Sequence, residues 1–123
     1  CLLSRGLGDV YKRQVKVLNN FIAAASVVSV RHVINQAEKF DLDIETIFKT
    51  IDTSSGQTWF GTNREKIDWF KEPYNDDNTI GILKKDVEAY VDAFENVSEL
   101  DNFVTGELSS SIIKAINNMP LTR

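Results

Sequence analysis

The longest uninterrupted pattern in the chain covers residues 15–40, which read VKVLNNFIAAASVVSVRHVINQAEKF. This stretch contains neither Gly nor Pro, and its Ala, Leu, Lys, Gln and Glu residues favour a helix, although its many Val residues lower that propensity. A helix of this length would run about 39 Å, which is longer than a small domain is wide. Its middle, residues 21–30, is apolar except for two serines, a composition typical of a helix that protein covers on every side. We therefore predict one long central helix.

Shorter amphipathic patterns follow the predicted central helix. Residues 44–51 place apolar side chains at positions 44, 47, 48 and 51, and Asp43 precedes them as an N-cap. Residues 53–56 then end this helix with a small polar cluster, in which Gly56 is able to adopt a positive φ. A short helix is expected within about residues 62–69.

The second half of the chain predicts two further helices. Residues 71–78 combine a proline with an Asn/Asp cluster and favour a loop. Apolar stripes then predict helices over residues 79–97 and 103–119, and Pro120 ends the second of them. The inward positions of that last helix are predicted to be Leu108, Ile112, Ala115, Ile116 and Met119.

No segment alternates between apolar and polar residues with the period of a strand, and no linker divides residues 15–123. We therefore predict an all-α fold, a bundle of four to six helices around one long N-terminal helix.

The opening segment, residues 1–14, reads CLLSRGLGDVYKRQ and has neither helical nor strand periodicity. It looks like a translated sequencing-adaptor read-through, so we expect it to be non-native and disordered and exclude it from the fold. Gly6 and Gly8 match the first half of a dinucleotide-binding GxGxxG motif. Tyr11 occupies the third glycine position and no βαβ pattern follows, so we reject this motif.

Composition narrows the range of partners. The 123 residues are 42% hydrophobic and 26% charged, which fits one soluble domain. The net charge of −4 provides no basic surface of the kind that nucleic acid requires. Polar residues interrupt every apolar run, so we expect no membrane span, and the single Cys weakly supports a cytoplasmic location. The acidic loop at residues 75–78 lacks the ligand spacing of a calcium site, so we expect no metal.

One compact polar group lies at the start of the central helix. Lys16 and Asn20 are four residues apart and share a helix face, with Asn19 beside them. The helix dipole disfavours a lysine near a helix start, yet a solvated helix end is the simpler explanation of this group. The only histidine, His32, is more consistent with a core or interface position than with a catalytic base. The residues by themselves thus indicate a helical domain without assigned chemistry.

Motifs in three regions of the chain, in order, carry a family resemblance. Residues 16–20 (KVLNN) match a K-x-x-N-N pattern, residues 42–43 and 53–59 match G-L-D and S-S-G-x-S-W, and residues 83–86 (LKKD) match L-x-K-D. These patterns resemble the C-terminal helical domain of the β-hydroxyacid dehydrogenases, which include 3-hydroxyisobutyrate dehydrogenase and tartronate semialdehyde reductase. The resemblance covers residues 16–59 and, less closely, residues 60–118. The related 6-phosphogluconate dehydrogenases have a different sequence after the lysine.

The resemblance implies an NAD(P)-dependent enzyme that oxidises a small 3-hydroxy acid or reduces the corresponding semialdehyde. It implies an N-terminal Rossmann domain, absent from this chain, and a helical domain that closes the active site and builds a homo-oligomer. Lys16 is implied as the catalytic lysine, Asn20 and Asn19 as substrate-binding residues, and Lys85 as a cofactor-binding residue. The chain alone is expected to be inactive, and the choice between NAD and NADP stays open.

Two positions depart from the family pattern. His32 stands where family members commonly carry Glu, and Asp41 stands where a glycine is expected before Leu42. An alternative function is a non-catalytic helical module for interaction or oligomerisation.

Overall fold

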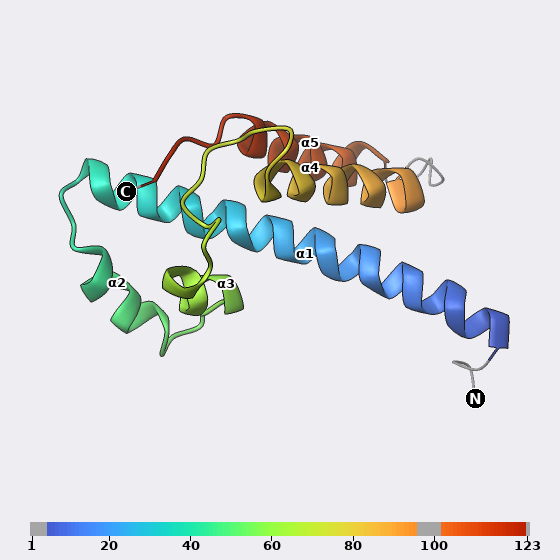
Figure 1. Ribbon diagram of the computed structural model, residues 1–123, viewed down its shortest axis with the longest axis horizontal. Helices are drawn as coiled ribbons and strands as arrows, with labels where there is room; N and C mark the ends of the chain where they lie inside the picture. Colours follow the sequence, from blue (N-terminus) through green and yellow to red (C-terminus); the bar gives the residue numbers. More distant parts are fainter. Residues whose placement is uncertain (1–4, 96–101, 123) are drawn as a thin grey trace.

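The computed structural model describes residues 5–95 and 102–122, and the secondary structure in these ranges is entirely helical (Figure 1). The described α-helices are α1 (Arg5–Lys39), α2 (Ile44–Ile51), α3 (Trp59–Asn63), α4 (Thr79–Tyr90) and α5 (Asn102–Asn117). A 3₁₀ turn, η1 (Arg64–Lys66), follows α3, and a π-helical turn, η2 (Val91–Glu95), follows α4. The prediction of an all-α bundle of four to six helices around one long helix is confirmed.

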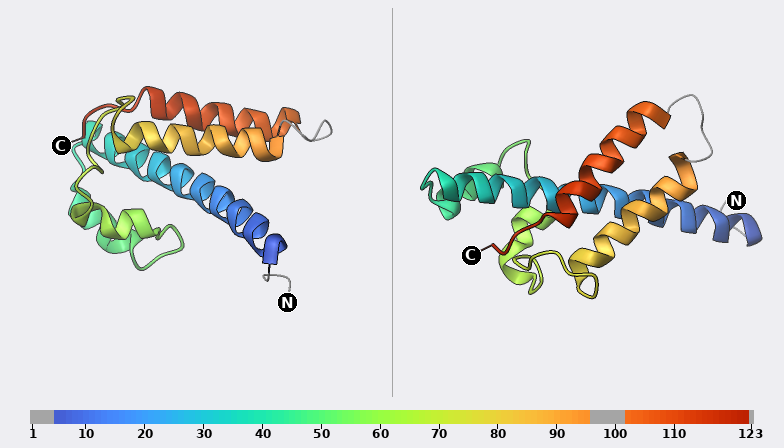
Figure 2. Two further views of the ribbon diagram at one scale, coloured as in Figure 1. Left: turned by 45° about the vertical axis from the view of Figure 1, so that its right-hand side comes forward. Right: turned by 90° about the horizontal axis from the view of Figure 1, so that it is seen from above.

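Helix α1 is the common packing partner of the other four helices. Helices α4 and α5 lie side by side and cross one side of α1, whereas α2 and α3 pack beside its C-terminal half (Figures 1 and 2). The N-terminal end of α1 extends beyond this packed region (Figure 2).

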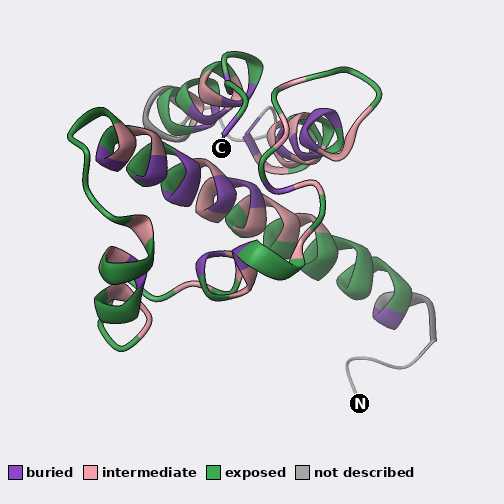
Figure 3. Ribbon diagram, turned by 60° about the vertical axis from the view of Figure 1, so that its left-hand side comes forward, coloured by how far each residue is buried: buried purple, intermediate pink, exposed green. Residues whose placement is uncertain are grey.

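The core lies along one face of α1. Ala24, Val27, Val30 and Ile34 are buried at intervals of three or four residues, which places them on a single helical face (Figure 3). Around them pack buried side chains from the other elements, namely Phe48, Phe70, Ile80, Leu83, Val87, Ile112, Ile116 and Met119.

The opposite face of α1 is not covered by this chain. Val15, Leu18 and Ile22 are 45%, 41% and 67% exposed. Within the predicted middle, residues 21–30, only Ile22 and Ser29 are exposed, so the prediction that protein covers it on every side is wrong for this chain at these two positions.

Helix α1 begins at Arg5, ten residues before the predicted start. The expected disorder of residues 1–14 is thus not seen for residues 5–14, while residues 1–4 lie outside the described residues. Extending an existing helix adds one hydrogen bond per residue without a new nucleation cost, so a segment without Pro can continue it. Residues 9–16 are all exposed, so this extension contributes little to the core.

By length and composition alone, Gly8–Lys39 could also cross a membrane. The core helix of a soluble protein meets the same criterion. In this structure the helix carries the buried Arg31 and packs against the four other described α-helices, and 28% of its most apolar window is buried.

The C-terminus of α1 closes with a Schellman motif. The Leu42 N–H donates to the Ala37 carbonyl at 2.9 Å, and the Asp41 N–H donates to the Glu38 carbonyl at 3.2 Å. Asp41 adopts φ of 56°, whereas none of the described glycines has a positive φ, Gly56 included. The left-handed residue is thus Asp41, at the position where the family pattern has glycine.

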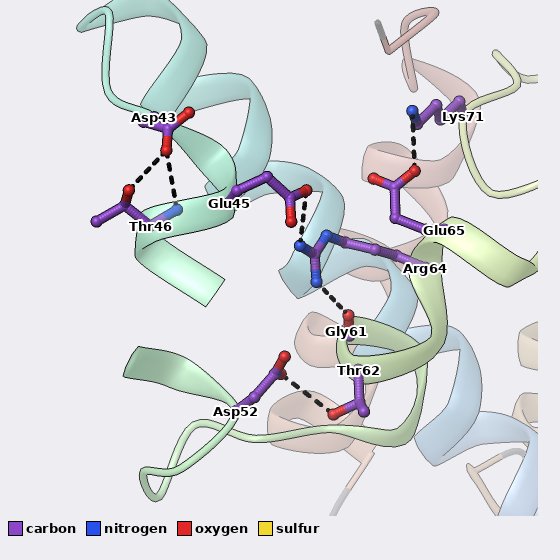
Figure 4. Close-up of polar contacts among 9 residues, drawn as sticks. All are labelled: Asp43, Glu45, Thr46, Asp52, Gly61, Thr62, Arg64, Glu65 and Lys71. Atoms are coloured by element: carbon purple, nitrogen blue, oxygen red, sulfur yellow. Dashed lines mark hydrogen bonds and ion pairs between the residues drawn. The ribbon is translucent and has the colours of Figure 1, made fainter. Parts of the chain in front are cut away.

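Helix α2 has the predicted bounds, and Asp43 caps it as predicted. The Asp43 carboxylate accepts hydrogen bonds from the Thr46 N–H at 3.1 Å and the Thr46 hydroxyl at 2.6 Å (Figure 4). The same carboxylate has its pKa held below the ordinary value, chiefly by the hydrogen bond from the Thr46 side chain and next by that from its backbone.

Helix α3 begins three residues before the predicted start at residue 62. Thr58 caps it by accepting a hydrogen bond from the Gly61 N–H at 2.8 Å. Arg64 then ties this segment to α2, because its guanidinium donates to the Gly61 carbonyl at 2.8 Å and pairs with Glu45 at 3.3 Å (Figure 4). Gly61 is itself buried, which marks close packing at this point.

The last two helices are shorter than predicted. Helix α4 ends at Tyr90 and gives way to the π-helical turn, and residues 96–101, the end of the predicted helix and the break after it, lie outside the described residues. Helix α5 ends at Asn117, before the buried Met119. The prediction that Leu108 faces inward is wrong, since this side chain is 56% exposed, whereas Ile112, Ile116 and Met119 are buried as predicted.

A buried arginine fastens the C-terminal tail. The guanidinium of Arg31 donates to the Thr122 hydroxyl at 3.0 Å, to the Glu72 carbonyl at 2.8 Å and to the carbonyls of Phe70 and Pro120. Burial lowers the pKa of Arg31, and the negative charge of Glu38 offsets part of this effect. Arg31 thereby joins three segments of the chain at one point.

Candidate functional site

The three polar residues predicted at the start of the central helix lie together on α1. Lys16 and Asn19 are exposed, and Asn20 is half-buried. The Asn19 amide donates to the Asn20 side-chain oxygen at 3.4 Å. The ammonium group of Lys16 is thus open to solvent, with two amides beside it.

Helix α4 adds a carboxylate to this group. Burial raises the pKa of the half-buried Asp86 above its ordinary value, while the Lys16 ammonium and a side-chain hydrogen bond from Asn20 lower it. Asp86 therefore faces both Lys16 and Asn20 across the contact between α1 and α4. Sequence reasoning did not assign Asp86 a role, although it is the last residue of the LKKD motif.

An aromatic stack fixes the two helices next to this group. The rings of Phe21 and Tyr90 are 4.1 Å apart between centroids and inclined by 28°. Phe21 follows Asn20 directly, and Tyr90 is one helical turn after Asp86, so the stack lies beside the polar cluster. Such a pair stabilises the crossing of α1 and α4 at the point where the polar residues meet.

Lys85 is exposed and lies beside Asp86 on α4. Adjacent residues of an α-helix are about 100° apart around its axis, so Lys85 and Asp86 point in different directions. The structure thus brings together the K-x-x-N-N and L-x-K-D motifs through Asp86, with Lys85 at the edge of the group.

Three hollows of the described surface lie elsewhere. A hollow of about 860 Å³ is lined at the C-terminal end of α1 by Asn35 and Lys39 among others, and Asn35 is about 29 Å along the helix from Lys16. A hollow of about 350 Å³ surrounds the exposed Trp59, and one of about 180 Å³ includes Arg64. None of these three hollows includes Lys16, Asn20 or Lys85.

His32 does not join the candidate site. Its side chain is exposed on α1, about four turns beyond Lys16, so it does not lie in the core of this chain, and the expected interface position stays a prediction.

Comparison with known proteins identifies the family. The sequence model of the family described as NAD-binding of NADP-dependent 3-hydroxyisobutyrate dehydrogenase matches residues 13–118. No curated protein and no solved structure matches the chain. The matched residues include both motifs that meet at Asp86. The chain belongs to this family of NAD-binding domains from 3-hydroxyisobutyrate dehydrogenase-like enzymes.

Proposed function

We propose that this chain is the helical part of an NAD(P)-dependent β-hydroxyacid dehydrogenase, acting on a small 3-hydroxy acid or its semialdehyde. The observation that carries the proposal is the meeting of Lys16 and Asn20 with Asp86 across the contact between α1 and α4. Membership of the NAD-binding family supports it, because a nicotinamide cofactor supplies hydride transfer when it is bound.

The chemistry of the donor set fits the proposed ligands. Lys16 and Lys85 are exposed cations, and Asn20 has a second amide hydrogen beyond the one directed to Asp86. Cations and amide donors suit the carboxylate of a hydroxy acid and the phosphates of a dinucleotide. In the proposed site, Asn20 and Asn19 hold the substrate and Lys85 contacts the cofactor.

Lys16 is the proposed catalytic residue. Oxidation of an alcohol carbon requires its hydroxyl to lose a proton, which a neutral lysine amine accepts. In the reductive direction the ammonium form donates a proton to the carbonyl oxygen. Lys16 is exposed and lies on a defined face of the rigid helix α1, so it reaches solvent for proton exchange.

The complete enzyme in this proposal also has an N-terminal Rossmann domain and assembles as a cytoplasmic homo-oligomer, whereas this chain alone is inactive. The exposed apolar face at Val15, Leu18 and Ile22 supports a further protein surface against α1. The same face supports the second candidate function, a non-catalytic interaction or oligomerisation module.

The test is to recover the reading frame upstream of residue 15 and to assay the encoded protein with NAD(P) and 3-hydroxy acids. We expect a GxGxxG-containing segment, and we expect Lys16→Ala to lower kcat by about 10³-fold or more. Lys49→Ala, which removes an exposed lysine of α2, should retain activity. A start codon immediately before residue 15, or full activity in Lys16→Ala, would contradict the proposal.

A further inference from the structure

The segment after α4 carries a buried pair of polar side chains. Glu95, the last residue of the π-helical turn η2, is 5% exposed, and its carboxylate accepts a hydrogen bond from the hydroxyl of Ser109 on α5. Ser109 is itself 1% exposed. The two residues are 14 positions apart in the sequence, so this hydrogen bond joins η2 directly to α5.

Stability alone is a poor explanation of this pair. Burial of a carboxylate costs free energy, and a hydrogen bond from a neutral hydroxyl returns only part of that cost. Two apolar side chains of similar shape would hold η2 against α5 at lower cost.

The backbone at Glu95 is also uncommon. Residues 91–95 form a π-helical turn, a conformation that is rare, appears mostly as single turns and is frequent at functional sites. A hydrogen bond from α5 to the last residue of this turn restrains the turn in its observed conformation.

The turn η2 carries one end of a row of aromatic rings that leads to the candidate site. The ring of Phe94 lies 5.4 Å from that of Tyr90, and the ring of Tyr90 stacks on Phe21 of α1 at 4.1 Å between centroids. Phe21 directly follows the half-buried Asn20. Because closely packed rings restrict one another's positions, the row connects the π-helical turn to the residue proposed to hold the substrate.

We propose that Glu95 is a positioning residue. Through the hydrogen bond from Ser109 it holds η2 in the conformation that keeps the aromatic row in place, and the row fixes the Asn20 amide beside Phe21. This inference rests on the proposed function, because Asn20 has a substrate to hold only there. It gives the site a restraint that lies outside its two motifs and acts through packing.

Three consecutive serines of α5 supply the test variants. Ser109 is buried, whereas Ser110 and Ser111 are exposed. Ser109→Ala removes the hydroxyl that donates to Glu95 and adds no bulk. Ser110→Ala makes the same change on the same helix outside the hydrogen bond, so it is the matched control.

The first test uses this chain and follows the aromatic row by NMR. In Ser109→Ala we expect weaker nuclear Overhauser effects between the rings of Phe21 and Tyr90 and a shifted side-chain amide resonance of Asn20. Ser110→Ala should leave both unchanged. A Ser109→Ala chain with a lower melting temperature but with unchanged ring contacts and an unchanged Asn20 resonance would show that the hydrogen bond is only structural, which would overturn the inference.

Glu95→Gln separates the hydrogen bond from the charge. The glutamine side-chain oxygen still accepts from Ser109, so the ring contacts should persist. Glu95→Leu fills a similar space without an acceptor and should disturb the ring contacts as Ser109→Ala does. Ring contacts that are lost in Glu95→Gln but kept in Ser109→Ala would assign the effect to the charge of the carboxylate and contradict the proposed role of the hydrogen bond.

The second test uses the complete enzyme and separates substrate binding from chemistry. A displaced Asn20 amide weakens one hydrogen bond to the substrate, so Ser109→Ala should raise KM for the hydroxy acid by about three- to tenfold and leave kcat within about twofold. Ser110→Ala should change neither constant. A lower thermal stability or a lower kcat in Ser109→Ala, with KM unchanged, would count against a positioning role.

The two tests separate the inference from the function on which it rests. If the ring contacts respond in this chain but the unmodified complete protein turns over no hydroxy acid, the proposed function fails and the restraint of the aromatic row by Glu95 stands. If turnover is normal but neither the ring contacts nor KM responds to Ser109→Ala, only the role of Glu95 fails.

Discussion

At the scale of single residues, the conformation of Asp41 explains why the family pattern has glycine at this position. Its φ of 56° lies in the left-handed region, where an L side chain is strained and glycine is not. The family pattern has glycine at this position, and the Schellman geometry of the α1 C-terminus gives the physical reason. Asp is among the residues that tolerate this region best, so the chain keeps the motif at a modest cost.

We expect Asp41→Gly to stabilise the chain by about 1 kcal/mol, because it removes the strain of the left-handed conformation. Thermal or urea unfolding followed by circular dichroism measures the effect. Lys39→Gly, two residues earlier and inside α1, is the control and should destabilise the chain by roughly 0.5–1 kcal/mol. If both substitutions shift stability in the same direction, the conformational explanation of Asp41 is wrong.

At Gly81 a side chain is excluded by the lack of space around the residue and not by its backbone φ. A Cβ built on it would lie 2.4 Å from the Asn75 carbonyl oxygen and 2.7 Å from that of Asp76, both of them backbone atoms of the preceding loop. The Gly81 N–H also donates to the side-chain oxygen of Asn78, the N-cap of α4, at 3.1 Å. A larger residue here must push the loop away from the helix start.

Gly81→Ala should therefore destabilise the chain by about 1–3 kcal/mol, the usual cost of overpacking. Gly106→Ala in α5 is the matched comparison, since a Cβ there would meet no heavy atom within 4 Å. That substitution should stabilise the chain by about 1 kcal/mol through helix propensity. Unfolding midpoints that fail to move in opposite directions would contradict this account.

At the scale of elements, Arg31 connects the central helix to two segments without regular structure. Its guanidinium joins α1 to the carbonyls of Phe70 and Glu72 and to the C-terminal tail at Pro120 and Thr122. Backbone hydrogen bonds also pair these segments, from Tyr74 to Met119 at 3.0 Å and from Thr122 to Lys71 at 2.9 Å. The oxygen atoms that accept hydrogen bonds from Arg31 carry no formal charge. This one side chain donates a hydrogen bond to each of them.

Arg31→Met should lower the free energy of unfolding by about 3 kcal/mol or more, because it leaves several buried acceptors without donors. Arg31→Lys keeps the charge but lacks the planar fork, so it should recover only part of the loss. Urea denaturation and amide exchange at Thr122 measure both the global and the local effect. Stability in Arg31→Lys equal to that of the unmodified chain would show that charge alone matters here.

The elements also show which features sequence could predict. Helix α2 was predicted with its bounds and cap because both depend on residues within one turn, from Asp43 to Thr46. Helix α3 was misplaced because its start depends on Thr58 and on the packing of the buried Gly61 against α1 and α2, which no local pattern contains. The role of Arg31 was missed for the same reason, since its partners lie 39 to 91 residues away.

The candidate site likewise has one part that the sequence could predict and one part that it could not. The shared face of Lys16 and Asn20 follows from helical spacing, and in the structure both lie on α1, with Lys16 exposed and Asn20 half-buried. The contribution of Asp86 depends on where α4 crosses α1, which the Phe21 and Tyr90 stack fixes and which sequence periodicity does not specify.

At the scale of the whole molecule, the uncovered face of α1 is the main departure from expectation. Residues 21–30 are apolar nearly all round, yet a strip of the helix that includes Ile22 stays exposed while most of the other residues pack in or against the core of this chain. Val15, Leu18 and Ile22 are spaced by three and four residues, which is the spacing of a helix-packing seam. The composition of α1 predicted that protein covers the helix on every side. That prediction holds only if another protein surface covers this seam.

We therefore expect the chain to associate with itself through the seam at Val15, Leu18 and Ile22 when no other domain covers it. Replacing Leu18 and Ile22 together by Glu puts two charges into the seam and should weaken association by about 100-fold or more, as measured by analytical ultracentrifugation. Leu108→Glu provides the control, because the exposure of Leu108 lies between those of Leu18 and Ile22 but Leu108 belongs to α5. Circular dichroism should show both variants folded, since neither position belongs to the core. Loss of association in Leu108→Glu, with association retained in the double variant, would place the interface on α5 and leave the apolar seam of α1 unexplained by self-association.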